Sequence, residues 1–341
     1  MSDEHAKTKT LPCEETILRL SECIDRLTRL AGDGPQHAVQ LERLGAAYSQ
    51  IRTEFYRHLS AWEIVQIARH PDRPGVLDYI DMIVTDFREL HGDRLFGDDS
   101  AIVTGFGRVA TRKVLIVGHN KGKTLAEKRK CNFGYAHPEG YRKALLKMNL
   151  AEKFGVPIVC IIDTPGADPG PGSEERGQAR AIAVNLREMS RLRVPIVCVI
   201  IGEGTSGGAL GIGVGDRVAI MQYAYCSVIS PEGCAAILWG TSTKASLAAE
   251  ALKLTGSSLR QTGYVDTIIP EPSGGAHGNK CSAAYALRAY LIAALCELEK
   301  YEISTLLENR YQMLRRIGRS AVGHRSEVEG PDDIARQIES S

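Results

Sequence analysis

The sequence predicts an α/β fold built around a parallel sheet. Two apolar runs rich in β-branched residues, 156–162 and 194–200, have the pattern of strands that are buried on both faces. The two runs are nearly identical in sequence, and a loop and a helical segment lie between them. Two buried strands joined by one helix should run parallel with a right-handed crossover. The loops that follow both strands should therefore face one crevice.

The first 60 residues predict a helical arm. Apolar residues recur at spacings of three and four over 14–31 and again over 39–59, and Gly-Asp-Gly-Pro at 32–35 separates the two stretches. We therefore divide the chain into an arm over 1–60, a main domain over 61–318 and a polar, mobile tail over 319–341.

Further elements are expected along the main domain. The 163–170 loop should lead into a helix with Ser173 as its N-cap and Glu174 and Glu175 in its first turn. The remaining expectations are a helix over 77–90, a hairpin over 101–118, a strand over 226–230, helices over 234–239 and 246–254, a strand over 265–269, a loop over 272–279, and two final helices over 281–300 and 302–317.

Composition excludes several classes of protein. With 42 basic and 41 acidic residues among 341, the formal net charge of +1 provides no bulk attraction to nucleic acid or to a membrane surface. The longest apolar runs have the length of strands, so no membrane span is expected. Nine cysteines without a Cys-x-x-Cys pair favour reduced thiols in the cytoplasm over disulfides or a metal site.

A basic stretch lies between residues 121 and 147, where eight cations are set against two carboxylates. Two interpretations remain open. It is either a solvated helix face or a seat for a phosphorylated ligand or an acidic partner.

The second apolar run continues into a glycine-rich segment, 202–208, which we expect to be a loop before a helix. Such a loop presents backbone N–H groups to a phosphate or to an oxyanion formed during a reaction.

Gly202, Gly204 and Gly207 match the dinucleotide fingerprint, but no acidic residue follows at the distance of a ribose ligand. Residues 118–124 resemble a phosphate-binding P-loop but are one residue short. No nucleophile–base pair is evident, which leaves backbone donors in two glycine-rich turns.

Residues 60–275 resemble the alpha subunits of bacterial acetyl-CoA carboxylase carboxyltransferases. The matching motifs are Ala-Arg-His-Pro (68–71), Asn-Phe-Gly-x-x-x-Pro-Glu-Gly-Tyr-Arg-Lys-Ala (132–144), Asp-Thr-Pro-Gly-Ala (163–167), Glu-Glu-Arg-Gly-Gln (174–178), Asn-Leu-Arg-Glu-Met-Ser-Arg-Leu (185–192), Ser-Gly-Gly-Ala (206–209), Gly-Val-Gly-Asp (213–216), Ser-Pro-Glu-Gly-Cys-Ala (230–235) and Ile-Pro-Glu-Pro-x-Gly-Gly-Ala-His (269–277).

The resemblance implies a crotonase-like (ClpP/crotonase) spiral of ββα units, here with an N-terminal helical extension. It also implies transfer of a carboxyl group from carboxybiotin, held on a biotin carboxyl carrier protein, to acetyl-CoA, which yields malonyl-CoA for fatty-acid synthesis. The implied partners are a zinc-ribbon beta subunit in an α2β2 heterotetramer, the carrier protein and a separate biotin carboxylase. Neither a metal in this chain nor a nucleic-acid or membrane partner is implied.

The resemblance also implies the site residues. The oxyanion-hole donors would be the backbone amides of Gly207, Gly208, Gly166 and Ala167, and the loops on the carboxybiotin side would contain Gly204, Thr205, Ser206, Asp168, Pro169 and Gly170. Thr205 and Asp168 depart from the usual family residues, a glycine and an aromatic. The Asp168 carboxylate would oppose an oxyanion unless Arg176 or another cation pairs with it.

Two other functions stay open from the sequence. The chain could be a non-catalytic scaffold for the beta subunit, or a stand-alone crotonase-type acyl-CoA enzyme.

Overall fold

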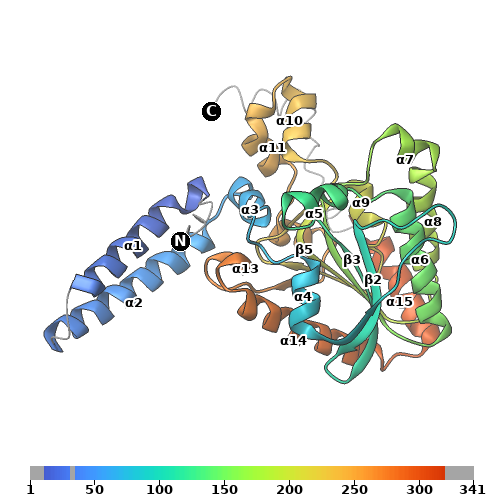
Figure 1. Cartoon of the computed structure of the whole chain (residues 1–341), viewed down its shortest axis with the longest axis horizontal. Helices are drawn as coiled ribbons and strands as arrows, with labels where there is room; N and C mark the ends of the chain where they lie inside the picture. Colours follow the sequence, from blue (N-terminus) through green and yellow to red (C-terminus); the bar gives the residue numbers. More distant parts are fainter. Residues whose placement is uncertain (1–10, 31–34, 319–341) are drawn as a thin grey trace.

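The core of the molecule is one eight-stranded sheet (Figure 1). The computed structural model describes residues 11–30 and 35–318. The strands are β1 (Val84–Glu89), β2 (Ile102–Val109), β3 (Arg112–His119), β4 (Ile158–Thr164), β5 (Ile196–Thr205), β6 (Arg217–Met221), β7 (Tyr225–Ser227) and β8 (Thr267–Ile269). Their order is β1-β2-β3-β4-β5-β6-β8, and β7 pairs with the end of β5. The first three strands are antiparallel, and every pairing from β3 onwards is parallel.

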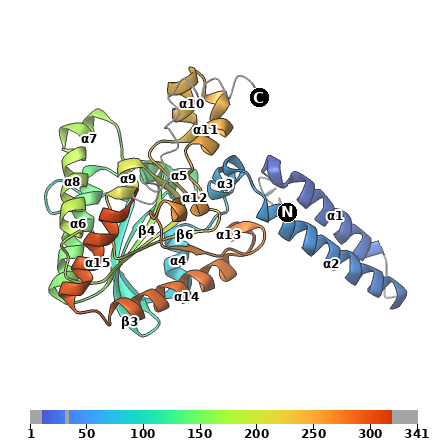
Figure 2. The ribbon, with the colours of Figure 1, turned by 180° about the vertical axis from the view of Figure 1, so that it is seen from behind.

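The described residues form fifteen α-helices, and some of these cover the two faces of the sheet. They are α1 (Glu15–Leu30), α2 (Pro35–Arg57), α3 (Ala61–Ala68), α4 (Val76–Ile83), α5 (Leu125–Lys130), α6 (Pro138–Lys153), α7 (Pro171–Glu175), α8 (Gln178–Met189), α9 (Ser206–Leu210), α10 (Pro231–Trp239), α11 (Ala245–Ala251), α12 (Gly256–Gln261), α13 (Gly275–Gly278), α14 (Lys280–Leu298) and α15 (Ile303–Arg316), with single 3₁₀ turns at Pro12–Glu14, Asn132–Gly134 and Ser242–Lys244. Helices α6 and α8 pack together on one face, and α4 and α14 pack together on the other (Figures 1 and 2).

The internal repeat is confirmed as a pair of neighbouring parallel strands. Strands β4 and β5 are buried along their whole length. They pair so that each residue faces its counterpart in the repeat, as Ile158 faces Ile196 and Cys160 faces Cys198. Because the strands are parallel and in register, the turns that follow them emerge at the same edge of the sheet.

The predicted glycine loop at 202–208 is partly wrong. Strand β5 continues to Thr205, because β7 adds a further partner along its end and pairs Glu203 with Tyr225 and Thr205 with Ser227. Gly202 and Gly204 are therefore strand residues. An added Cβ on Gly202 would lie 2.5 Å from the Asp163 carboxylate, so close packing explains this glycine. The dinucleotide interpretation fails for the same reason.

The helix predicted over 77–90 is also wrong in its second half. Helix α4 ends at Ile83, and the chain continues as β1, an edge strand that pairs antiparallel with β2. Only Val84 of β1 is buried, so the sequence lacks the alternation that marks a strand.

Several other boundaries differ from the prediction. The helix expected after Ser173 is two helices that meet at Gly177 (φ +80°), and Ser173 is buried inside α7 instead of capping it. The strand expected over 226–230 ends at Ser227, and the 272–279 loop contains the short helix α13. Strand β6 and helices α3 and α6 were not predicted. Long-range pairing and packing set these boundaries, and local sequence signals them weakly.

Helices α1 and α2 form the predicted hairpin, which extends away from the sheet (Figure 1). Its base is fastened to the main domain. The Glu14 carboxylate accepts a hydrogen bond from the Tyr56 hydroxyl and lies 3.3 Å from Nε2 of His277. Arg52 donates to the backbone oxygen of Ser273 at 2.7 Å. The predicted mobile tail over 319–341 and most of the 32–35 break lie outside the described residues.

Helix α14 is long and apolar enough to cross a membrane by length and composition alone. In the folded chain it is a core helix, because Leu287, Leu291 and Leu295 are buried against the sheet.

Helix α15 is attached to the main domain through Arg310, whose side chain is fully buried. The guanidinium donates to both oxygens of Asp216 at 2.8 and 2.7 Å. It also donates to the backbone oxygens of Met189, Leu192 and Val194 at 2.8 to 2.9 Å. All five N–H groups of the guanidinium are therefore satisfied.

Replacing this arginine should be costly. Arg310→Met leaves the buried Asp216 without its cation, so we expect the free energy of unfolding to fall by about 3–5 kcal/mol. Urea denaturation measures this change. Arg187→Met is the matched control, because Arg187 pairs with Glu188 on the surface. It should cost less than about 1 kcal/mol. Equal effects of the two substitutions would contradict the assignment.

Candidate functional site

The two glycine-rich turns meet in space. The turn after β4 contains Gly166 and Ala167, and the turn after β5 contains Gly207 and Gly208. An added Cβ on Gly208 would lie 2.4 Å from the carbonyl carbon of Gly166 and 2.6 Å from the amide nitrogen of Ala167. No side chain fits between the two backbones, so glycine at 208 is required for this contact.

A cleft of about 690 Å³ opens beside this contact, and we call it the glycine cleft. Seven of the ten predicted site residues line it: Gly166, Ala167, Asp168, Pro169, Thr205, Ser206 and Gly207. The other three do not. Gly208 is buried behind the wall, Gly204 is buried inside β5, and Gly170 donates its N–H to Asp168 at 3.2 Å.

Hydrogen bonding narrows the set of available amide donors. The Gly166 N–H, predicted as an oxyanion donor, already donates to the Thr164 hydroxyl at 3.1 Å. The Asp168 N–H donates to the backbone oxygen of Ala136 at 3.0 Å. The Ala167 N–H between them makes no hydrogen bond within the described part of the chain. Gly207 lies in the first turn of α9, where helical N–H groups have no partner in the helix. Gly207 and Ala167 thus supply the uncommitted donors in the cleft wall.

Arg176, the cation that the sequence offered as a partner for Asp168, does not form an ion pair with it. Arg176 pairs with Glu139 instead. Asp168 accepts hydrogen bonds from the Asn132 side chain at 2.9 Å and from the Gly170 N–H, and its Oδ2 lies 4.0 Å from Nε2 of His137. Partial burial works against the charge, but these hydrogen bonds keep the pKa of Asp168 below its ordinary value. Asp168 is therefore a carboxylate at neutral pH.

Ser206 occupies a strained turn. Its φ is +57°, and it is the first residue of α9, directly after β5, with Gly204 and Gly208 two residues to either side, the spacing of a nucleophile elbow. Its hydroxyl forms no hydrogen bond to a histidine or carboxylate among the described residues, so no base activates it. The cleft therefore offers backbone donors without an activated nucleophile.

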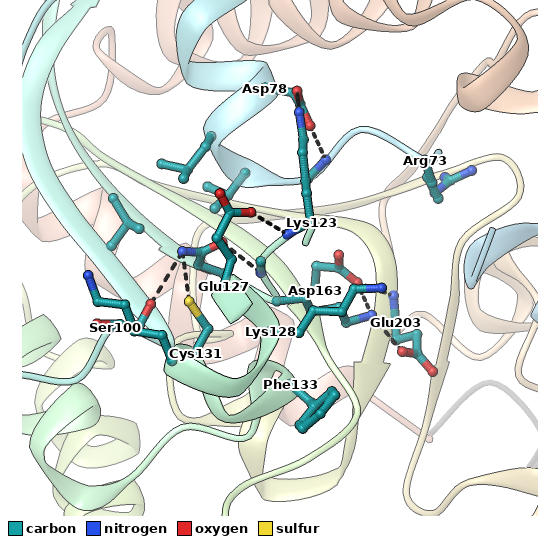
Figure 3. Close-up of a pocket in the computed structure, with 18 of the residues that line it drawn as sticks. Arg73, Asp78, Ser100, Lys123, Glu127, Lys128, Cys131, Phe133, Asp163 and Glu203 are labelled. Carbon is teal, nitrogen blue, oxygen red and sulfur yellow. Dashed lines mark hydrogen bonds and ion pairs between the residues drawn. The ribbon is translucent and has the colours of Figure 1, made fainter. Parts of the chain in front are cut away.

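A second cleft of about 700 Å³, the charged cleft, adjoins the same strand ends. Nζ of Lys121 lies 2.6 Å from Asp163 and 2.5 Å from Glu203. Figure 3 shows these two carboxylates side by side. Arg69 binds Glu203 at 2.6 Å and Glu232 of α10 at 2.5 Å, and it lines both clefts. Burial alone would raise the pKa of Glu203, but the cations of Lys121 and Arg69 hold it at about 2.

The charged cleft is electrically balanced, with seven cationic side chains and seven carboxylates among its lining residues. Most of the basic stretch is paired inside the protein, since Arg142 binds Asp93 and Lys143 binds Asp98. Lys147 contacts the backbone oxygens at 91 and 92. The three cations at the end of α5, residues 128–130, form no described ion pair. Because most of these cations are paired inside the protein, the 121–147 stretch as a whole is neither a solvated helix face nor a seat for a phosphorylated ligand or an acidic partner.

One group in the described residues has the composition of a cation site. Glu14, His70 and His277 place their ligand atoms within 4.8 Å of one another at the base of the arm. The Nδ1 atom of His70 accepts the N–H of Asp72 at 3.1 Å, so in the neutral ring the proton is on Nε2. The two rings are stacked with centroids 3.9 Å apart. Near-parallel rings do not converge on one metal ion, and the group acts as a hydrogen-bonded junction.

Sequence reasoning missed several residues of the glycine cleft. Gln178 donates to the backbone oxygens of Ala136 and Asp168 at 2.7 and 3.0 Å, which fixes the turn after β4. Arg69, Tyr135 and Ile182 also line this cleft. Arg69 and Gln178 lie within motifs that resemble the family, but only their position in the folded chain assigns them to the site.

Known proteins share this architecture. A transcarboxylase 12S structure with hydrolysed methylmalonyl-coenzyme A bound is similar with a TM-score of 0.56 and 23% identity, over 71% of this chain and 45% of that one. A Pseudomonas malonate decarboxylase hetero-tetramer in complex with coenzyme A has a TM-score of 0.51 and 15% identity, over 72% of this chain and 92% of that one. These likenesses confirm the predicted crotonase-like fold.

Sequence comparison identifies the family. The acetyl-coenzyme A carboxylase carboxyltransferase subunits alpha of Yersinia enterocolitica and Yersinia pestis are each 51% identical to this chain over 312 residues, which covers 90% of this chain and 98% of theirs. The model of the family described as acetyl co-enzyme A carboxylase carboxyltransferase-like matches residues 10–318. The match covers almost the whole length of the relatives, and the fold and glycine turns are those that the motifs predict. The chain belongs to the acetyl-coenzyme A carboxylase carboxyltransferase family.

Proposed function

We propose that this chain is the alpha subunit of a carboxyltransferase that moves a carboxyl group from carboxybiotin to acetyl-CoA, forming malonyl-CoA for fatty-acid synthesis. One observation supports this most strongly. Two backbone turns in contact present uncommitted N–H donors at Gly207 and Ala167 to one cleft that has no activated nucleophile. A site of this kind stabilises negative charge in a reactant that brings its own reactivity.

The residues of the glycine cleft fit such a reactant. Carboxybiotin supplies a transferable carboxyl group and, after its release, a basic ring nitrogen. The chain's own part is to hold negative charge on an oxygen with the amides of Gly207 and Ala167. One preorganised donor of this type contributes roughly 3–4 kcal/mol in the transition state. Asp168 and Glu232 line the same cleft. Glu232 is paired with Arg69, and the Asp168 carboxylate disfavours an anion beside it, so the backbone amides supply the contacts that favour negative charge.

The proposal includes partners and location. Because the relatives are named as alpha subunits, and as the family resemblance implies, we infer a beta subunit that completes the site, with a zinc ribbon and an α2β2 assembly. A biotin carboxyl carrier protein would deliver the carboxyl group, and a separate biotin carboxylase would load it. We further propose a cytoplasmic location, no metal in this chain, and a division into an arm over 1–60 and a main domain over 61–318.

The direct test is malonyl-CoA-dependent carboxylation of free biotin by this chain mixed with its beta subunit. We expect turnover from the mixture and none from either chain alone, because each contributes part of the site. No turnover from a well-folded complex would overturn the proposal. Acyl-CoA turnover by the isolated chain would instead favour a stand-alone enzyme.

The two glycines of the second turn separate a catalytic subunit from a scaffold. Gly208→Ala puts a methyl group 2.4 Å from the Gly166 backbone and should force the turns apart, lowering kcat at least about a hundredfold. Gly207→Ala is the matched control, because its methyl group would meet Ile182 at an ordinary 3.6 Å and its N–H is kept. We expect it to stay within about tenfold of wild type. If this chain were only a scaffold, complexes of the beta subunit with either variant would keep wild-type turnover. Gel filtration checks that each variant still forms the complex.

A further inference from the structure

The helix that carries Gly207 is too short to hold its own geometry. Helix α9 has five residues, and an isolated helix of that length does not persist in water. Its entry residue Ser206 has a left-handed backbone, which adds strain at the start of the turn. The position of the Gly207 amide must therefore be set by groups outside α9.

Tyr141 of α6 is one buried side chain that contacts α9. Its hydroxyl donates to the backbone oxygen of Gly208 at 3.3 Å. Its ring packs against Gly211, where an added Cβ would lie 2.4 Å from Cε1 of the ring. The side chain is completely buried and does not line the glycine cleft. Burial raises the pKa of Tyr141, so the hydroxyl keeps its proton and remains a donor.

Asn185 of α8 closes the connection. Its side-chain amide donates to the backbone oxygen of Tyr141 at 3.0 Å and to the backbone oxygen of Gly211 at 2.9 Å. Tyr141 thus contacts α9 in two ways. Its hydroxyl binds the backbone oxygen of Gly208, and its own backbone oxygen shares the Asn185 amide with the backbone oxygen of Gly211. Both α6 and α8 belong to the layer of helices on one face of the sheet. The position of α9 is therefore fixed by side chains from packed, rigid helices.

We propose that Tyr141 is a positioning residue for the carboxyl-transfer reaction, which orients α9 so that the Gly207 amide faces the oxyanion without Tyr141 touching a substrate. The inference rests on the proposed function. It predicts that the Tyr141 hydroxyl contributes to kcat while contributing little to substrate binding, because α9 is already packed and only its orientation is relaxed.

The test is Tyr141→Phe in the full chain assembled with the beta subunit. We expect kcat to fall about fivefold, the size expected for one lost neutral hydrogen bond, with KM within about twofold of wild type. Amide hydrogen exchange at Leu210 and Gly211 should accelerate by a similar factor, because these amides report on the integrity of α9. Tyr290→Phe is the matched control. The hydroxyl of Tyr290 in α14 is also buried but has no hydrogen-bond partner among the described residues, so its removal should leave kcat and exchange at α9 unchanged.

The outcomes are separable. Wild-type exchange and wild-type kcat in Tyr141→Phe would overturn the positioning role. An equal loss of kcat in Tyr290→Phe, or a lower melting temperature with unchanged kcat, would assign the hydroxyl to general stability and would also overturn it. If the wild-type complex shows no carboxyl transfer, the proposed function itself fails. The exchange measurement still decides whether Tyr141 orders α9.

Discussion

The site depends on the direct contact of two backbone segments. Gly208 lies against the peptide of Gly166 and Ala167 at a distance that leaves no room for a Cβ. This contact places the N–H groups of two separate turns on one wall without any side chain between them. Backbone amides are fixed donors that need no protonation change, so these donors do not themselves titrate in the pH range of the folded chain.

The rest of the fold brings those two turns together and keeps them there. Parallel pairing of β4 with β5 in register sends both turns to one edge of the sheet. Ion pairs fasten the surrounding elements: partly buried Lys121 joins the ends of β4 and β5, and Arg69, which follows α3, joins that helix to β5 and α10. Arg310 does the same for the C-terminal helix. Removing one partner of such a pair strands a buried charge, so these contacts tie each element firmly to the sheet.

The sequence predicts the centre of the molecule better than its periphery. Strands β4 and β5 are continuous β-branched runs, and their repetition alone indicates that they pair. Ala167 and Gly207 are found through the resemblance, since glycine-rich turns without side-chain chemistry carry no catalytic signal of their own. The Gly166 donor is lost to the Thr164 hydroxyl, a short-range competition that a motif does not show. Tyr141 and Asn185 sit in quoted motifs, but their contacts with α9 depend on packing between α6, α8 and the sheet.

We propose that the amides of Gly207 and Ala167 bind the oxygen that becomes negative. The most direct measurement is a crystal structure of the assembled complex with biotin bound. We predict that an oxygen of the ligand lies about 2.7–3.1 Å from the amide nitrogen of Gly207, Ala167 or both. A ligand bound elsewhere, with both amides facing solvent or bonded to the protein, would contradict the account.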